Sequence, residues 1–156
     1  MRLYFLRHAD ALPGADDDMR PLSKLGQRQS QAVANLLLNA GIEFDAAYSS
    51  PLVRARETAE IVLPVTNKDR RIILELTGAL RNEERNFGGW LKKIQEGKNI
   101  LLVGHNPSMS ENIARLAKLP VNDFEMSKGM LACLRTEDRQ NFSLKLLIGP
   151  KMMGVK

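Results

Sequence analysis

Short apolar runs alternate along the chain with longer segments in which apolar residues recur every three or four positions. The runs predict buried strands at residues 1–7, 44–49, 72–76 and 99–103, and two paired strands at 129–135 and 142–148. The periodic segments predict helices at 23–39, 51–64 and 86–95, and one from Asn106 or Ser108 to Ala117. Strands that alternate with helices predict an α/β fold, a three-layer sandwich with a mostly parallel central sheet flanked by helices.

Residues that start or stop helices mark several of these boundaries. Ser23 can cap the first helix, and Gly41 can end it in the left-handed conformation that glycine adopts easily. Pro51 suits the first turn of the next helix because its φ angle is fixed and it needs no hydrogen-bond acceptor. Residues 8–22 hold two prolines, a glycine and three consecutive aspartates, which predict a loop.

The composition is that of a globular domain. With 156 residues, 44% of them hydrophobic and 26% charged, the chain is expected to form a single domain over residues 1–156. The one cysteine, Cys133, excludes an internal disulfide and is expected to lie in the core. No apolar run reaches the roughly 20 residues of a membrane span, so we expect a cytoplasmic protein that does not bind a membrane.

The net charge of +5 favours an anionic partner. Nucleic acid is not the partner we expect, because only 5% of the residues are aromatic and the basic residues are scattered rather than clustered. A small phosphate group fits the scattered basic residues at least as well. The last six residues, 151–156, are a candidate for a loose basic tail.

Two histidines, the only ones in the chain, each follow a predicted buried strand: His8 follows residues 1–7, and His105 comes shortly after residues 99–103. Ligands of open α/β sheets bind beyond the carboxyl ends of the strands, so these two side chains can converge at one edge. A single histidine in such a position more often has a structural role. Two at equivalent strand ends make a shared site an equal alternative.

Arginines accompany the histidines. Arg7 directly precedes His8, Arg20 lies late in the loop, and Arg54 comes early in the helix that follows Pro51. Guanidinium groups match phosphate oxygens in a two-pronged geometry, and helix N-termini near Pro51 and Asn106 would add partial positive charge. Each arginine alone could be a solvated surface residue, as we expect for Arg28, Arg56 and Arg70, but Arg7 ends a buried strand and needs a partner.

Other chemical motifs are absent from the sequence. It has no glycine-rich nucleotide loop, no paired-histidine zinc motif, and no glycines around Ser49 and Ser50 to form a nucleophile elbow. The acidic run Asp16–Asp18 suggests a solvated loop more strongly than a cation site. We therefore expect no bound metal.

Four blocks of sequence together form a specific pattern. They are Leu6-Arg7-His8-Ala9, Arg20-Pro21-Leu22-Ser23 with Gly26, Ser49 to Ala55 followed by Glu57-Thr58-Ala59, and Leu102 to Pro107. These blocks resemble the histidine phosphatase superfamily, which has the phosphoglycerate mutase-like fold, and in particular its small SixA-type phosphohistidine phosphatases. They occur in family-like order and spacing, which makes their combination far more specific than a lone Arg-His pair.

The resemblance implies a role for each matching residue. His8 would be the nucleophile that accepts the phosphoryl group, with Arg7, Arg54 and His105 forming the phosphate pocket and Arg20 contacting the phosphoryl group from the loop. Ala9 departs from the glycine usual in the wider superfamily, a departure that the small SixA-like members tolerate. The implied chemistry needs no metal or organic cofactor.

The substrate depends on the leaving group. A phosphorylated protein carrying phosphohistidine, as in a phosphorelay, is the first expectation, because imidazole leaves more easily than an alkoxide. Hydrolysis or mutase transfer of small phosphorylated substrates such as sugar phosphates is the alternative. It would need an acid, for which the candidates are Glu75, Glu83 and Glu84. Residues 82–89 faintly resemble the mutase donor loop, but Asn86 more simply starts a helix. A silent phosphate-binding module is less expected, because the residues that the chemistry needs are present.

Overall fold

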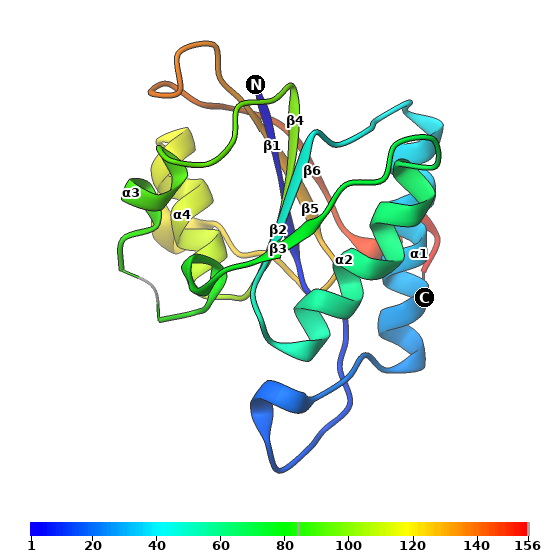
Figure 1. Ribbon diagram of the computed structural model, residues 1–156. Coiled ribbons are helices and arrows are strands. Elements are labelled where there is room, and N and C mark those ends of the chain that lie inside the picture. The colour runs from blue at the N-terminus through cyan, green and yellow to red at the C-terminus, as the bar shows by residue number, and fades with distance from the viewer. Residues whose placement is uncertain (84, 156) are drawn as a thin grey trace.

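A six-stranded mixed sheet forms the centre of the protein in the computed structural model, which describes residues 1–83 and 85–155. Within these residues the strand order is β3-β2-β4-β1-β5-β6 (Figure 1). The first four strands in sequence are mutually parallel, β5 runs antiparallel to β1, and β6 runs antiparallel to β5. The strands are β1 (Arg2–Arg7), β2 (Ala46–Ser49), β3 (Leu74–Leu76), β4 (Asn99–Gly104), β5 (Leu131–Arg135) and β6 (Ser143–Ile148).

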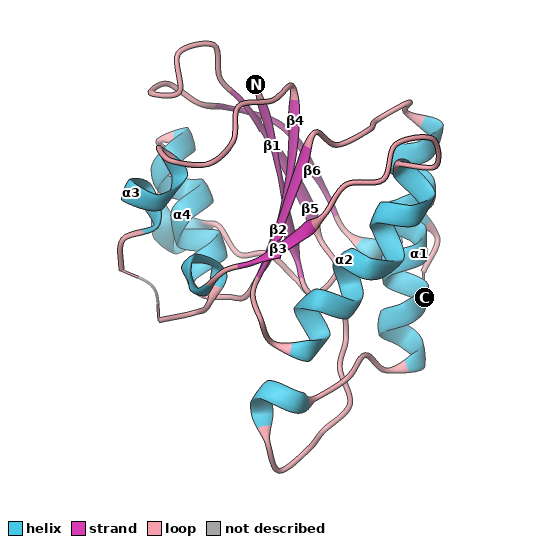
Figure 2. Ribbon diagram, viewed as in Figure 1, coloured by secondary structure: helices cyan, strands magenta, loops and turns pink. Residues whose placement is uncertain are grey.

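Helices cover both faces of the sheet. Figure 2 shows α1 (Lys24–Asn39) and α2 (Val53–Thr66) on one face, and α3 (Phe87–Leu91) and α4 (Ser108–Ala117) on the other. The predicted three-layer α/β sandwich with a mostly parallel sheet is confirmed. None of the helices in the described residues is long and apolar enough to cross a membrane.

The central strand β4 is buried on both sides along its whole length. Ile100 and Leu102 pack in the core layer beneath α3 and α4, while Leu101 and Val103 pack in the layer beneath α1 and α2. A strand covered on both faces has no polar side, which is why this segment reads as a continuous apolar run rather than an alternating one.

Three helix boundaries differ from those predicted. Helix α2 begins at Val53 with Leu52 as its N-cap, so Pro51 lies just before the helix and not in its first turn. Helix α2 continues past Pro64 to Thr66, because Pro64 lies on the exposed side, where water can replace the hydrogen bond it cannot donate. Helix α3 ends at Leu91 rather than near residue 95. The Arg139 guanidinium donates to the carbonyls of Leu91 and Ile94 at 3.1 and 3.2 Å, and so replaces the partners that another helical turn would provide.

The long loop 8–23 projects beyond the carboxyl ends of the parallel strands (Figure 1). Ser23 caps α1 as predicted, since its hydroxyl accepts a hydrogen bond from the Gly26 N–H at 3.0 Å. A Cβ at Gly26 would lie only 2.0 Å from the Asp10 carbonyl oxygen, so the close contact between loop and helix requires glycine there. The loop therefore starts and ends against rigid structure.

The C-terminal residues are not a loose tail as far as the structure describes them. Pro150–Met153 form a short 3-10 turn next to α1, in which Pro150 is buried and Met153 packs against the core. These apolar side chains hold the segment in place although Lys151 is exposed. Lys156, the last residue of the predicted tail, lies outside the described residues.

Candidate active site

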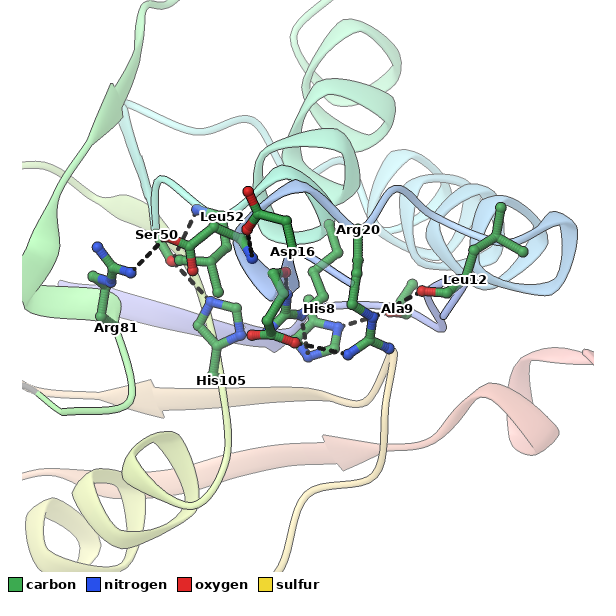
Figure 3. Close-up of polar contacts among 12 residues, drawn as sticks. His8, Ala9, Leu12, Asp16, Arg20, Ser50, Leu52, Arg81 and His105 are labelled. Atoms are coloured by element: carbon green, nitrogen blue, oxygen red, sulfur yellow. Dashed lines mark hydrogen bonds and ion pairs between the residues drawn. The ribbon is translucent and has the colours of Figure 1, made fainter. Parts of the chain in front are cut away.

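The two histidines lie side by side at the carboxyl edge of the sheet. His8 follows β1 and His105 follows β4, and these strands are parallel neighbours in which Arg7 pairs with Gly104. The ring centroids are 4.9 Å apart, and both side chains are buried (Figure 3). Their register brings together two residues that are far apart in the sequence.

The His8 ring has one nitrogen fixed by the backbone and the other directed at an arginine. Its Nδ1 lies 2.8 Å from the carbonyl oxygen of Ala9. Because a carbonyl oxygen only accepts hydrogen bonds, the proton of the neutral ring belongs on Nδ1. The Nε2 lone pair then accepts a hydrogen bond from Arg54 Nε at 3.4 Å. The His8 Nε2 atom is thus the unprotonated ring nitrogen, and its lone pair faces Arg54.

His105 is held by Ser50, which directly follows the neighbouring strand β2. Its Nε2 lies 2.8 Å from the hydroxyl oxygen of Ser50, which also accepts a hydrogen bond from the Leu52 N–H at 3.3 Å. The His105 Nδ1 atom is buried and has no hydrogen-bond partner within the described part of the chain. Ser50 was not among the predicted site residues. Its position directly after a short strand was the feature of the sequence that could have indicated it.

Arg7 and Arg54 reach the same place from different elements. Arg7 ends β1 and donates from Nη1 to the Met126 carbonyl at 2.7 Å, which provides the partner that a buried charge needs. Its Nε is buried and unpaired among the described residues. The first turn of α2 carries Arg54, and one turn later Thr58 accepts a hydrogen bond from the Ala9 N–H, which ties the helix to the His8 segment.

The acidic run in the loop contacts these arginines rather than only water. Asp17 binds Arg54 Nη2 at 3.1 Å and Arg20 Nη1 at 2.9 Å, and Asp18 binds Arg81 at 3.0 Å. The side chains of Asp17 and Asp18 are more than half exposed, as expected of a solvated loop, but the fold also brings Arg54 and Arg81 from two other segments to them. Residues 1–83 and 85–155 contain no cluster of three or more side chains suited to hold a metal ion.

A pocket of about 440 Å³ opens between the loop and the histidine pair. In the view of Figure 3, Arg20 and Arg81 lie on opposite sides of the two rings. Among the candidate acids, Glu83 lines this pocket, Glu75 lies exposed on the edge strand β3 away from it, and Glu84 is outside the described residues. The lining residues are Arg7, His8, Asp17, Asp18, Arg20, Leu52, Arg54, Arg81, Asn82, Glu83, His105, Asn106 and Lys128.

Both histidines are held in the neutral state. Burial, followed by the charges of Arg54 and Arg7, lowers the pKa of His8 to about 4, although the contact with the Ala9 carbonyl opposes this shift. Burial, followed by the charges of His8 and Arg54, lowers the pKa of His105 to about 3. At neutral pH the Nε2 lone pair of His8 is therefore available to attack an electrophile.

These pKa values predict how stability depends on pH. Both lie below the value of 6.5 for an unperturbed histidine, so the unfolded chain binds more protons than the folded one between pH 6.5 and about 4. The free energy of unfolding should therefore fall on acidification, by about 2 kcal/mol for each histidine between pH 7 and pH 5. Urea unfolding at several pH values measures this slope. His8→Gln should flatten the slope, and an unchanged slope in this variant would contradict the assignment.

Comparisons with known proteins agree with this geometry. Residues 3–96 match the family model of the histidine phosphatase superfamily (branch 1). The chain is 30% identical over 121 residues to the phosphohistidine phosphatase SixA of Escherichia coli K12, with 74% of each chain covered. It is 24% identical to the adenosylcobalamin/alpha-ribazole phosphatase of the same organism, with 100% of this chain and 99% of that protein covered.

Solved structures show the same fold. A structure of SixA complexed with tungstate superposes with a TM-score of 0.84 at 22% identity, covering 98% of this chain and 99% of that one. A putative SixA from Agrobacterium tumefaciens superposes with a TM-score of 0.78 at 23% identity, covering 96% and 97%. The chain therefore belongs to branch 1 of the histidine phosphatase superfamily, as an enzyme with the fold of the SixA structures.

Proposed function

We propose that this protein hydrolyses phosphohistidine through a covalent intermediate on His8. The observation that supports this most directly is the His8 Nε2 lone pair, which is fixed by the Nδ1 contact to Ala9 and lies at the wall of an arginine-lined pocket. In the first step, Nε2 forms a bond to phosphorus, and the bond from phosphorus to the substrate's imidazole nitrogen breaks. The departing nitrogen takes up a proton from solvent and leaves as neutral imidazole.

In the second step, water attacks the phosphorus atom and the bond to His8 Nε2 breaks. Inorganic phosphate is released, one proton of the water passes to solvent, and the neutral imidazole of His8 is restored. Negative charge spreads over the equatorial oxygens in both steps, and fixed donors can stabilise it there. Arg7, Arg54 and His105 surround the His8 ring and are the proposed donors, with Arg20 reaching in from the loop.

The leaving group favours phosphohistidine, carried on a protein such as a phosphorelay component. Imidazole needs only one proton to depart as a stable molecule, so the pocket requires little help from an acid. The similarity to the phosphohistidine phosphatase SixA supports this substrate, as does the tungstate complex of a SixA structure, because tungstate is an oxyanion like phosphate.

A second candidate is a phosphatase or mutase for small phosphate esters. One observation favours it: Glu83, which carries a carboxyl group, is among the residues that line the pocket. An acid in this wall could protonate the alkoxide oxygen of an ester as it leaves. Ester cleavage therefore needs Glu83 as an acid, whereas phosphohistidine cleavage does not.

Comparing two substrates in the wild type and in Glu83→Gln separates these functions. We expect kcat/KM for a phosphohistidine peptide to exceed that for glucose 6-phosphate by about 100-fold or more, because the ester lacks a good leaving group. Glu83→Gln should change the rate on the peptide by less than about threefold. Faster turnover of the ester, with a large loss in Glu83→Gln, would establish the second function instead.

A further inference from the structure

The carboxylate of Asp17 accepts hydrogen bonds from Arg54 and Arg20, two of the arginines that line the pocket. Its Oδ2 accepts a hydrogen bond from Arg54 Nη2 at 3.1 Å, and its Oδ1 accepts one from Arg20 Nη1 at 2.9 Å. The backbone carbonyl of Asp17 accepts a third, from Arg54 Nη1 at 2.6 Å. One loop residue thus bridges two arginines as the oxygens of a phosphate would.

The Nε donors of these two arginines are also engaged. Arg54 Nε donates to His8 Nε2, and Arg20 Nε donates to the Leu12 carbonyl at 2.8 Å. The Asp17 charge is also close enough to His105 to oppose, in part, the lowering of that pKa by burial. A phosphoryl group that is to take the Arg54 Nη2 and Arg20 Nη1 donors must therefore displace the Asp17 carboxylate.

The contacts that hold this loop in place can be broken. Asp18 binds Arg81 at 3.0 Å and Asp10 binds Lys128 at 2.8 Å, and all four of these side chains are partly exposed. The Asp17 side chain itself is 62% exposed. Exposed ion pairs are individually weak, so a doubly charged phosphoryl group can compete with them.

Resting on the proposed function, we infer that Asp17 is an internal anion that competes with the phosphoryl group for Arg54 and Arg20, and so weakens the binding of the inorganic phosphate product. The fraction of protein with the arginines free sets the apparent affinity of any oxyanion. Because this fraction is a property of the free protein, it reduces the affinity for different oxyanions by the same factor. After each turnover the tethered carboxylate returns to the arginines as phosphate leaves.

Binding of inorganic phosphate and of tungstate, measured by calorimetry, tests this inference without turnover. In Asp17→Asn, both dissociation constants should fall by the same factor, about fivefold. Asp18→Asn is the matched control, because it removes the same charge from the same loop and the same pocket but contacts Arg81 instead. It should tighten binding by less than about twofold. Asp17→Ser, also lacking the carboxylate, should behave as Asp17→Asn does.

Equal effects in the Asp17 and Asp18 variants would mean that only the general charge of the loop matters, and would overturn the inference. Weaker phosphate binding in Asp17→Asn would also overturn it, since Asp17 would then position the arginines for the ligand. Neither outcome bears on the role of His8. Conversely, full turnover by a variant without His8 would refute the proposed mechanism. It would not affect the inference that Asp17 competes for Arg54, because that inference is tested by binding alone.

Discussion

Replacing His8 with alanine should lower kcat by at least about 10⁴-fold, the largest effect that we expect of any substitution. The variant lacks the nitrogen that is proposed to form the bond to phosphorus. His105 is the other histidine of the pocket, and its Nε2 is engaged by Ser50. Single-turnover and steady-state kinetics with a phosphohistidine peptide measure the loss.

The controls for this variant are its affinity for phosphate and its unfolding transition. Arg7, Arg54 and His105 remain in His8→Ala, so phosphate should still bind within a few-fold of the wild-type affinity, and the urea unfolding transition at pH 7 should stay cooperative. Loss of turnover with retained binding isolates the covalent step. Retained turnover would show that water attacks the substrate directly, with His8 serving only as a wall of the pocket.

Arg54→Ala should lower kcat/KM by about 10³-fold, the second largest effect. This side chain contributes a fixed positive charge and donates through Nε to His8 Nε2, so its loss removes a donor for the phosphoryl oxygens and a group that orients the nucleophile. Arg54→Lys keeps the charge but not the planar guanidinium group. We expect its kcat/KM to be only about tenfold higher than that of Arg54→Ala.

The matched control is Arg56→Ala, two residues further along α2. Arg56 pairs with Glu60 at 3.4 Å on the same helix and does not line the pocket. Its replacement should leave kcat/KM within about twofold of the wild type. A comparable loss in both variants would mean that the effect comes from a damaged helix and not from the pocket.

The sheet could be predicted from sequence because each buried strand carries its own signal. Residues 99–103 form an uninterrupted apolar run, since both faces of β4 are covered. The positions of His8 and His105 at two strand ends also predicted that they could meet, because parallel strands share one carboxyl edge. Local pattern and a general rule of topology were sufficient for both.

What could not be predicted depends on contacts between distant segments. The end of α3 is set by Arg139, which lies far along the chain and leaves no trace in the periodicity of residues 86–95. The Asp16–Asp18 run suggests solvent or a cation when taken alone. Only the folded chain brings Arg54 and Arg81 to Asp17 and Asp18, and so gives these carboxylates their partners.

The most direct test of the account is to trap the covalent intermediate. A phosphohistidine substrate is mixed with the enzyme, the reaction is quenched within milliseconds under alkaline conditions that preserve phosphorus–nitrogen bonds, and the phosphorylated residue is located by mass spectrometry. We predict one acid-labile phosphoryl group on His8, attached at Nε2 and absent from His8→Ala. A phosphoryl group found on another residue, or burst kinetics with none on His8, would contradict the account.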